Sequence, residues 1–325
     1  MKRMLLSAVC AVLLALCVFS ADCAQAVRSA LELCLYRAVP SLFPFFAIGS
    51  LAVSCGLAQV CGHLFAPCMR RVFHLPPCAS AALVLGFLGG YPAGARVAAE
   101  LYQDGQCTQE EASSIAACCN NTGPAFLIGM CGGGLFQSVR IGVFLYAVHI
   151  ISALVCAVLF RPSAIPPVRK EPDAEQLPSF VSALTRSVLS AGRSCLMICA
   201  FILFFAVILC LMQCTGSFSL LLSGFIKLPF LSSLSHVGCQ GLLTGIFELT
   251  QGLAYMQPEA GSLPARLTAV SFLCAFGGLS VLCQTAAVAE GLCVKKCLRG
   301  KCIHALCAAL LCRFVLIFPI FSALL

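Results

Sequence analysis

Long apolar stretches alternate with short polar segments along the whole chain. A run of about 20 apolar residues is long enough to cross a bilayer as a helix. The pattern therefore predicts a helical membrane protein with about eight or nine spans. They are expected at residues 1–21, 39–60, 79–101, 112–135, 139–160, 195–212, 237–256, 267–290 and 303–321.

Two of these stretches are interrupted by residues that cannot continue a regular helix. The first interruption is Gly89-Gly90-Tyr91-Pro92-Ala93-Gly94, and the second is Asn120-Asn121-Thr122-Gly123-Pro124. Glycine permits any backbone conformation, and proline removes an amide hydrogen and restricts the residue before it. Unwound backbone at membrane depth needs partners from protein, water or a ligand, so these segments are expected to be broken or re-entrant helices.

The second half of the chain shows interruptions in corresponding places, near Glu248 and Gly277. Paired interruptions in two sequence halves are typical of transporters that bind substrate between structural repeats. The order of the motifs predicts an N-terminal span with an interfacial segment (1–37), a first repeat (38–160), a polar linker (161–185) and a second repeat (186–325).

The distribution of basic residues predicts an orientation. If Lys2 and Arg3 lie in the cytoplasm, nine spans also place there the basic cluster Lys295, Lys296, Arg299 and Lys301. The same count places the acidic loop at Asp104 on the opposite face. The N-terminal run also has the form of a secretion signal, but an uncleaved first span is the preferred interpretation.

Composition supports the membrane assignment, because 61% of the residues are hydrophobic, only 10% are charged and the mean hydropathy is +1.01. A soluble domain carries about 25% charged residues. The net charge of +8 does not indicate nucleic-acid binding, since the basic residues lie at the ends of apolar runs. The 25 cysteines fall mostly within apolar runs, where they serve as small hydrophobic residues, and their spacing predicts no metal site.

Several polar residues at membrane depth are candidates for a substrate site. The paired asparagines Asn120 and Asn121 either bind a ligand or cap a kink, and Tyr91 and Pro92 serve either ligand approach or close packing. Arg96 either neutralises an anion or extends to the interface. His149, alone on an apolar face, is expected to be a core residue. The predicted substrate-binding residues are Gly89, Gly90, Tyr91, Pro92, Gly94, Asn120, Asn121, Thr122, Gly123, Gly277, Gly278, Ser280 and Gln284.

Glu248 is the strongest single candidate. A charged side chain inside an apolar span costs about 2.5–3.5 kcal/mol on insertion scales, and such residues are functional by default. A carboxylate is a poor direct ligand for an anion. Glu248, with Thr250 beside it, is therefore predicted to couple transport to a proton or a cation, or to act as a neutral hydrogen-bonding acid.

Four motifs together resemble the sporulation integral membrane protein family called YlbJ-like. They are Gly-Phe-Leu-Gly-Gly-Tyr-Pro-Ala-Gly-Ala at 86–95, Asn-Asn-Thr-Gly-Pro at 120–124, Gly245-x-x-Glu248-x-Thr250-x-Gly252 and Phe276-Gly277-Gly278-Leu279-Ser280. The resemblance covers about residues 35–320. It implies two copies of the nucleoside-recognition or gate domain, which also occurs in concentrative nucleoside transporters and ferrous-iron permeases. It further implies passage of dipicolinic acid across the outer forespore membrane.

The sequence thus predicts a transporter in a bacterial cell membrane for a small, anionic, aromatic metabolite, with the outer forespore membrane as its place if the resemblance holds. The expected partners are the lipid bilayer, the substrate and a second copy of the chain, with no nucleic acid and no cofactor beyond a coupling proton or cation. A membrane scaffold for the spore envelope is the alternative. HExxH, GxSxG and Walker motifs are absent from the sequence, so no enzyme is predicted.

Overall fold

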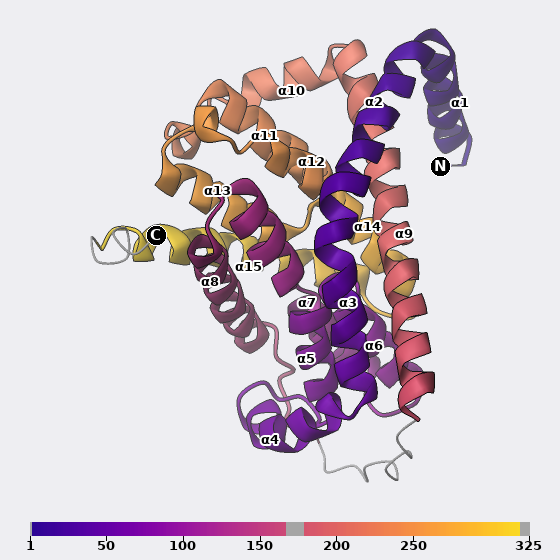
Figure 1. Ribbon diagram of the computed structural model, residues 1–325, viewed down its shortest axis with the longest axis vertical. Coiled ribbons are helices and arrows are strands. Elements are labelled where there is room, and N and C mark those ends of the chain that lie inside the picture. The colour runs from indigo at the N-terminus through magenta and orange to yellow at the C-terminus, as the bar shows by residue number, and fades with distance from the viewer. Residues whose placement is uncertain (1, 167–178, 319–325) are drawn as a thin grey trace.

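The computed structural model describes residues 2–166 and 179–318, and every regular element within these ranges is a helix (Figure 1). The chain is an all-α membrane protein, as predicted. Four helices are long and apolar enough to cross a bilayer: Ser20–Ser54, Val139–Leu159, Phe180–Cys214 and Leu263–Val288.

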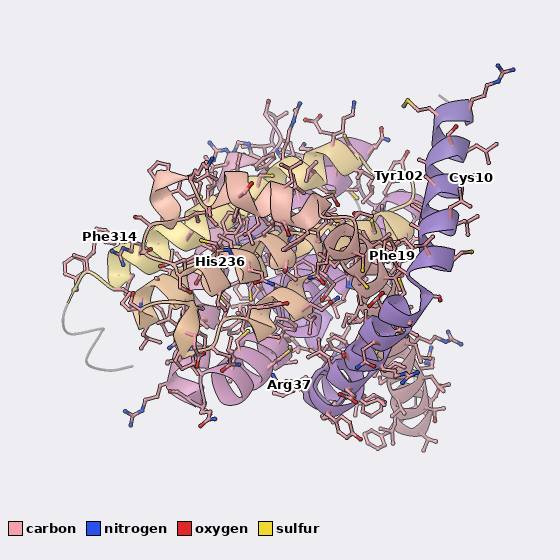
Figure 2. All side chains as sticks on the ribbon, turned by 90° about the horizontal axis from the view of Figure 1, so that it is seen from above. Cys10, Phe19, Arg37, Tyr102, His236 and Phe314 are labelled. Atoms are coloured by element: carbon pink, nitrogen blue, oxygen red, sulfur yellow. The ribbon has the colours of Figure 1, made fainter. Side chains whose placement is uncertain are left out.

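The N-terminal region is more continuous than the sequence suggests. Helix α1 (Lys2–Val18) is followed by α2 (Ser20–Leu33), the π-helical turn η1 (Cys34–Ala38) and α3 (Val39–Ser54), and the last three form one 35-residue helix. At 1.5 Å per residue this helix is about 52 Å long. The predicted boundary at residue 37 therefore falls inside this helix, because Pro40 lies in the first turn of α3 and does not end the helix. Figure 2 shows α1, with Cys10, standing clear of the helical bundle.

The predicted span at 79–101 is a helical hairpin. Helix α5 (Ala79–Gly89) and α6 (Ala93–Gln103) are connected by Gly90-Tyr91-Pro92, and the Cys78 thiol lies 3.9 Å from the carbonyl oxygen of Gln106. Two residues 28 positions apart meet only if the chain has reversed direction. An 11-residue helix rises about 16 Å, roughly half of a bilayer core. We call this segment hairpin 1.

The predicted span at 237–256 is also a hairpin, with Glu248 at its tip. Helix α11 (His236–Phe247) and α12 (Leu249–Ala254) lie side by side, and the Ser235 hydroxyl donates to the carbonyl oxygen of Glu259 at 2.6 Å. We call this segment hairpin 2. Both segments therefore take the re-entrant form that the interrupted sequence allowed, and neither is a single crossing helix of the nine-span count. A short apolar hairpin has the hydropathy of one crossing helix.

The other two interruptions break helices that continue beyond them. Helix α7 (Gln109–Cys119) leads through Asn120–Pro124 into the π-helical η2 (Ala125–Leu135), and α13 (Leu263–Phe276) leads through Gly277 into α14 (Gly278–Val288). We call these interruptions break 1 and break 2.

The same order of elements occurs twice in the described chain. The remaining members are α4 (Leu57–Arg71), α8 (Val139–Leu159), α9 (Phe180–Cys214), α10 (Ser217–Phe225) and α15 (Val294–Val315), with the short turns η3 (Pro229–Leu231) and η4 (Pro258–Ala260). Thus α3, α4, hairpin 1, α7, η2 and α8 correspond in order to α9, α10, hairpin 2, α13, α14 and α15. The first half ends with α8 at Leu159 and the second begins with α9 at Phe180, so the predicted linker end at 185 falls inside α9.

The hairpins also change the predicted orientation. The side chain of Gln109 donates to the carbonyl oxygen of Gly291 at 2.7 Å, and the Lys296 ammonium donates to Ser114 Oγ at 2.7 Å. The start of α7, next to the acidic loop at Asp104, therefore lies beside the start of α15. The prediction that this loop and Lys296 lie on opposite faces is wrong, because hairpin 1 returns the chain to the side from which it came.

The core joins the two halves. Helix α15 packs against α7 and α8 of the first half as well as α13, and α3 packs along α9. Cysteine fills this interior as a small apolar residue: Cys131, Cys156 and Cys274 have no exposed surface.

Candidate functional site

Hairpin 1 meets break 1 through two glycines. Gly90 has a φ of +68°, and a Cβ atom there would lie 3.1 Å from the amide nitrogen of Gly123. A Cβ atom on Gly123 would lie 3.0 Å from the amide nitrogen of Gly90. Because both backbones occupy this space and Gly90 has a positive φ, glycine at both positions lets the tip of hairpin 1 lie directly on the unwound segment of α7–η2 without displacing it.

Tyr91 connects the tip of hairpin 1 to the second half. Its hydroxyl donates to the carbonyl oxygens of Cys274 at 3.0 Å and Ala275 at 3.3 Å. Thr122 of break 1 donates to the same Cys274 oxygen at 2.6 Å. These carbonyls lie in the last turn of α13, where break 2 leaves them without helical partners. Side chains of the first half therefore satisfy backbone groups that the second half exposes at membrane depth.

The paired asparagines have different partners. The side-chain amide of Asn120 donates to Thr285 Oγ1 of α14 at 2.7 Å, whereas that of Asn121 donates to the carbonyl oxygen of Cys118 at 2.7 Å. Asn121 thus caps the end of α7, and Asn120 joins the two halves. The Oδ1 atoms of both are buried without a hydrogen-bond partner, as is Oε1 of Gln284, whose amide donates to Ser280.

Glu248 lies at the tip of hairpin 2 and is only 2% exposed. It ends α11 and begins α12, and its Oε2 accepts a hydrogen bond from the amide of Gln251 at 2.7 Å. Gly278 of break 2 lies against this tip, because a Cβ atom there would lie 2.8 Å from the Gly245 carbonyl oxygen. Hairpin 2 therefore contacts break 2 as hairpin 1 contacts break 1.

A small cavity of about 50 Å³ lies where the hairpin tips and the breaks meet. Seven of the predicted site residues line it: Gly90, Tyr91, Thr122, Gly123, Glu248, Thr250 and Gln284. The remaining lining is apolar and includes Leu42, Phe46, Phe126 and Val281. The cavity has room for a few water molecules and combines hydroxyl, amide and carboxylate groups.

Other predicted residues lie beside the cavity and not on its wall. Gly94 packs against the Cys119 carbonyl, Gly277 lies against the Tyr91 ring, and Ser280 accepts from Gln284. Arg96, Gly89 and Pro92 line a separate hollow of about 260 Å³ on the outer side of Tyr91.

A second hollow, of about 240 Å³, lies beyond Thr250 and is lined by Arg37 and Ser41. Tyr91 and Phe46 line both the cavity and the Arg96 hollow, and Thr250 lines both the cavity and the Arg37 hollow. The tip of hairpin 1 thus lies between the cavity and the Arg96 hollow, and the first turn of α12 lies between the cavity and the Arg37 hollow.

Sequence reasoning missed Lys301, which it assigned to the cytoplasmic basic cluster. The side chain is 1% exposed, and its ammonium donates to the Tyr91 hydroxyl at 3.0 Å and to the Asn120 carbonyl oxygen. The helical pattern of α15 contained the signal: the buried positions Cys297, Lys301, His304, Ala308 and Cys312 recur every three or four residues and form one face.

His149 is buried as expected, but it has polar partners. Its Nε2 accepts the amide hydrogen of Thr122 at 3.1 Å, and its ring lies 4.6 Å from that of His304, centroid to centroid. His304 Nε2 lies 3.1 Å from Ser152 Oγ. The two imidazoles extend the polar interior from break 1 to the interface of α8 and α15.

Comparison with known proteins agrees with these motifs. Residues 35–161 match the family described as Gate: Nucleoside recognition. The sporulation integral membrane protein YlbJ of Bacillus subtilis (strain 168) is 29% identical over 288 residues, which cover 81% of this chain and 70% of the Bacillus protein. No solved structure matches the chain. The resemblance that the motifs predict is confirmed: this integral membrane protein is similar to YlbJ over most of its length, and its first half matches the Gate family.

Proposed function

We propose that the protein carries a small, anionic, aromatic metabolite across the membrane by alternating access between two gate-type repeats. The observation that carries this proposal is the convergence of two hairpin tips, break 1 and the first turns of α14 on one small cavity that holds hydroxyl, amide and carboxylate groups among apolar side chains. Repeat transporters bind their substrates near the bilayer midplane, at the repeat interface, between discontinuous helices. The resemblance to the YlbJ-like family adds dipicolinic acid as the substrate and the outer forespore membrane as the place.

The size of the cavity is consistent with a closed state. About 50 Å³ is far below the roughly 300–1,000 Å³ of sites that bind small molecules. An aromatic dicarboxylate therefore enters only if a hairpin tip moves away. Movement of hairpin 1 would join the cavity to the Arg96 hollow, and movement of hairpin 2 would join it to the Arg37 hollow.

In this proposal the role of each site residue follows from its position. Thr122, Gln284 and the backbone at Gly90 and Gly123 contact the substrate, while Arg96 attracts an anion to the hollow outside hairpin 1. Glu248 and Thr250 couple movement of hairpin 2 to a proton or a cation. The amide oxygens without partners in the closed state become available to accept hydrogen bonds from water.

Uptake by reconstituted vesicles tests the proposal. Vesicles that contain the purified protein should accumulate labelled dipicolinate, and Gln284→Ala should lower the initial rate by at least about tenfold, the lower limit for loss of one hydrogen bond to a charged group. Gln103→Ala, at an exposed position near the end of α6, is the matched control and should transport normally.

A scaffold role predicts a different result. Empty vesicles and vesicles with the wild-type protein would then take up dipicolinate equally, and the Gln284→Ala and Gln103→Ala variants would not differ. Direct binding of dipicolinate to the purified protein separates loss of binding from loss of movement.

A further inference from the structure

Lys301 is a buried lysine that the transport scheme above does not use. Its ammonium has two hydrogen-bond acceptors, the Tyr91 hydroxyl and the Asn120 carbonyl oxygen, and lies 4.4 Å from the centre of the Tyr91 ring. Both acceptors are neutral oxygens. A buried charge persists only where its surroundings replace the water it has lost, so these groups must supply that stabilisation.

The Lys301 ammonium lies at the C-terminal end of α7, where an ion could bind. Asn120 is the C-cap of α7, with φ −84° and ψ 87°, so its carbonyl lies outside the regular helix. The C-terminal end of a helix carries a partial negative charge, and the face of an aromatic ring also attracts a cation. In transporters with broken helices, unwound carbonyls and half-helix C-termini of this kind coordinate the coupling ion.

The contacts of Lys301 also join parts that are distant in sequence. The residue belongs to α15, Tyr91 to the tip of hairpin 1 and Asn120 to break 1. The Tyr91 hydroxyl in turn donates to Cys274 in the last turn of α13. One ammonium group therefore holds the hairpin 1 tip against the ends of two broken helices.

We propose that the ammonium of Lys301 is a tethered cation, which occupies a cation site formed by the end of α7 and the tip of hairpin 1 and so makes a bound metal ion unnecessary there. The geometry supports this proposal, because the ammonium contacts a carbonyl oxygen, a hydroxyl oxygen and the face of an aromatic ring, all in the protein interior. The inference does not depend on the substrate proposed above.

The test removes the Lys301 side chain by substitution and then supplies a free cation in its place. Lys301→Ala should unfold at a lower temperature in detergent than the wild type, because the site is empty. Addition of ethylammonium, at constant ionic strength with choline as the balancing ion, should raise the transition by at least about 2 °C and saturate with concentration. Neither the wild type nor Lys295→Ala, an exposed lysine on the same helix, should respond.

Substitutions of similar size separate charge from packing. Lys301→Met keeps the length of the side chain without the charge and should be destabilised, whereas Lys301→Arg keeps a cation and should accumulate in membranes better than the methionine variant. A methionine variant as stable as the wild type would overturn the proposal. So would an alanine variant that ignores ethylammonium, or equal failure of Met and Arg to accumulate, since shape and not charge would then decide. Because stability is measured without substrate, failure of dipicolinate uptake leaves this result unchanged.

Discussion

Tyr91 and Thr122 share one hydrogen-bond acceptor, the carbonyl oxygen of Cys274. Either side chain alone can satisfy this buried oxygen, but removal of both leaves it without a partner at membrane depth. We therefore expect Tyr91→Phe and Thr122→Val to be strongly coupled. Tyr91→Phe removes only a hydroxyl and Thr122→Val replaces one with a methyl group, so the packing of the site changes little.

The magnitudes follow from the contacts. Thr122→Val removes one neutral hydrogen bond while Tyr91 still donates to Cys274, and should cost about 0.5–1.5 kcal/mol. Tyr91→Phe also removes an acceptor from the Lys301 ammonium and should cost about 1.5–3 kcal/mol, the range for hydrogen bonds to charged groups. The double variant additionally leaves the Cys274 oxygen unsatisfied, so its cost should exceed the sum of the two by about 1–2 kcal/mol.

Thermal unfolding of the purified protein in detergent measures this coupling. An excess of 1–2 kcal/mol corresponds to a further fall of at least about 2 °C beyond the sum of the single shifts. Thr185→Val, at an exposed hydroxyl that bonds only within α9, is the control and should leave the transition unchanged. Additive shifts within about 0.5 kcal/mol would refute the shared-acceptor reasoning, because independent sites add to that accuracy.

Three further predictions concern packing, coupling and topology. Gly94→Ala places a methyl group on a backbone oxygen of α7 and should reduce the amount of protein in the membrane severalfold on immunoblots, whereas Gly192→Ala, in open space on α9, should have no effect. Glu248→Gln should retain dipicolinate binding while its transport loses dependence on pH or on a cation gradient; an unchanged profile would leave Glu248 as a capping residue only. Cysteines introduced at Asp104 and Lys295 in a background without native cysteines should be labelled from the same side of the membrane, and labelling from opposite sides would contradict the hairpin.

The positions of the helix breaks could be predicted from sequence because they depend on local chemistry. Gly-Gly-Tyr-Pro and Asn-Asn-Thr-Gly-Pro remove helical backbone hydrogen bonds wherever they occur, and the structure interrupts the helices at these segments. Glu248 was conspicuous for the same reason, since an isolated carboxylate in an apolar run is costly. Seven of the predicted residues line the cavity as a result.

The path of the chain at each break could not be predicted in the same way. Whether a helix continues or reverses depends on close contact between segments, such as the approach of Gly90 to Gly123, and hydropathy does not report such contact. The same limitation led to a wrong placement of the acidic loop at Asp104 relative to Lys296. Lys301 was hidden by its neighbours, because a basic cluster at the end of an apolar run is typical of a cytoplasmic flank, and only the helical periodicity of α15 separates it from Lys295.

The two buried ionisable side chains of the site both lie at helix ends. The Lys301 ammonium contacts the C-terminal end of α7, where the helix carries partial negative charge, and Glu248 accepts a backbone amide hydrogen at the N-terminal end of α12. Each side chain thus has its own helix end and its own hydrogen bonds, without an ion pair between them among the contacts described. Because hairpin 1 is held by Lys301 and hairpin 2 is capped by Glu248, the two tips are secured by separate interactions. In the proposed transport cycle one tip can therefore open while the other stays closed, which alternating access requires and which a shared Lys301–Glu248 ion pair would prevent.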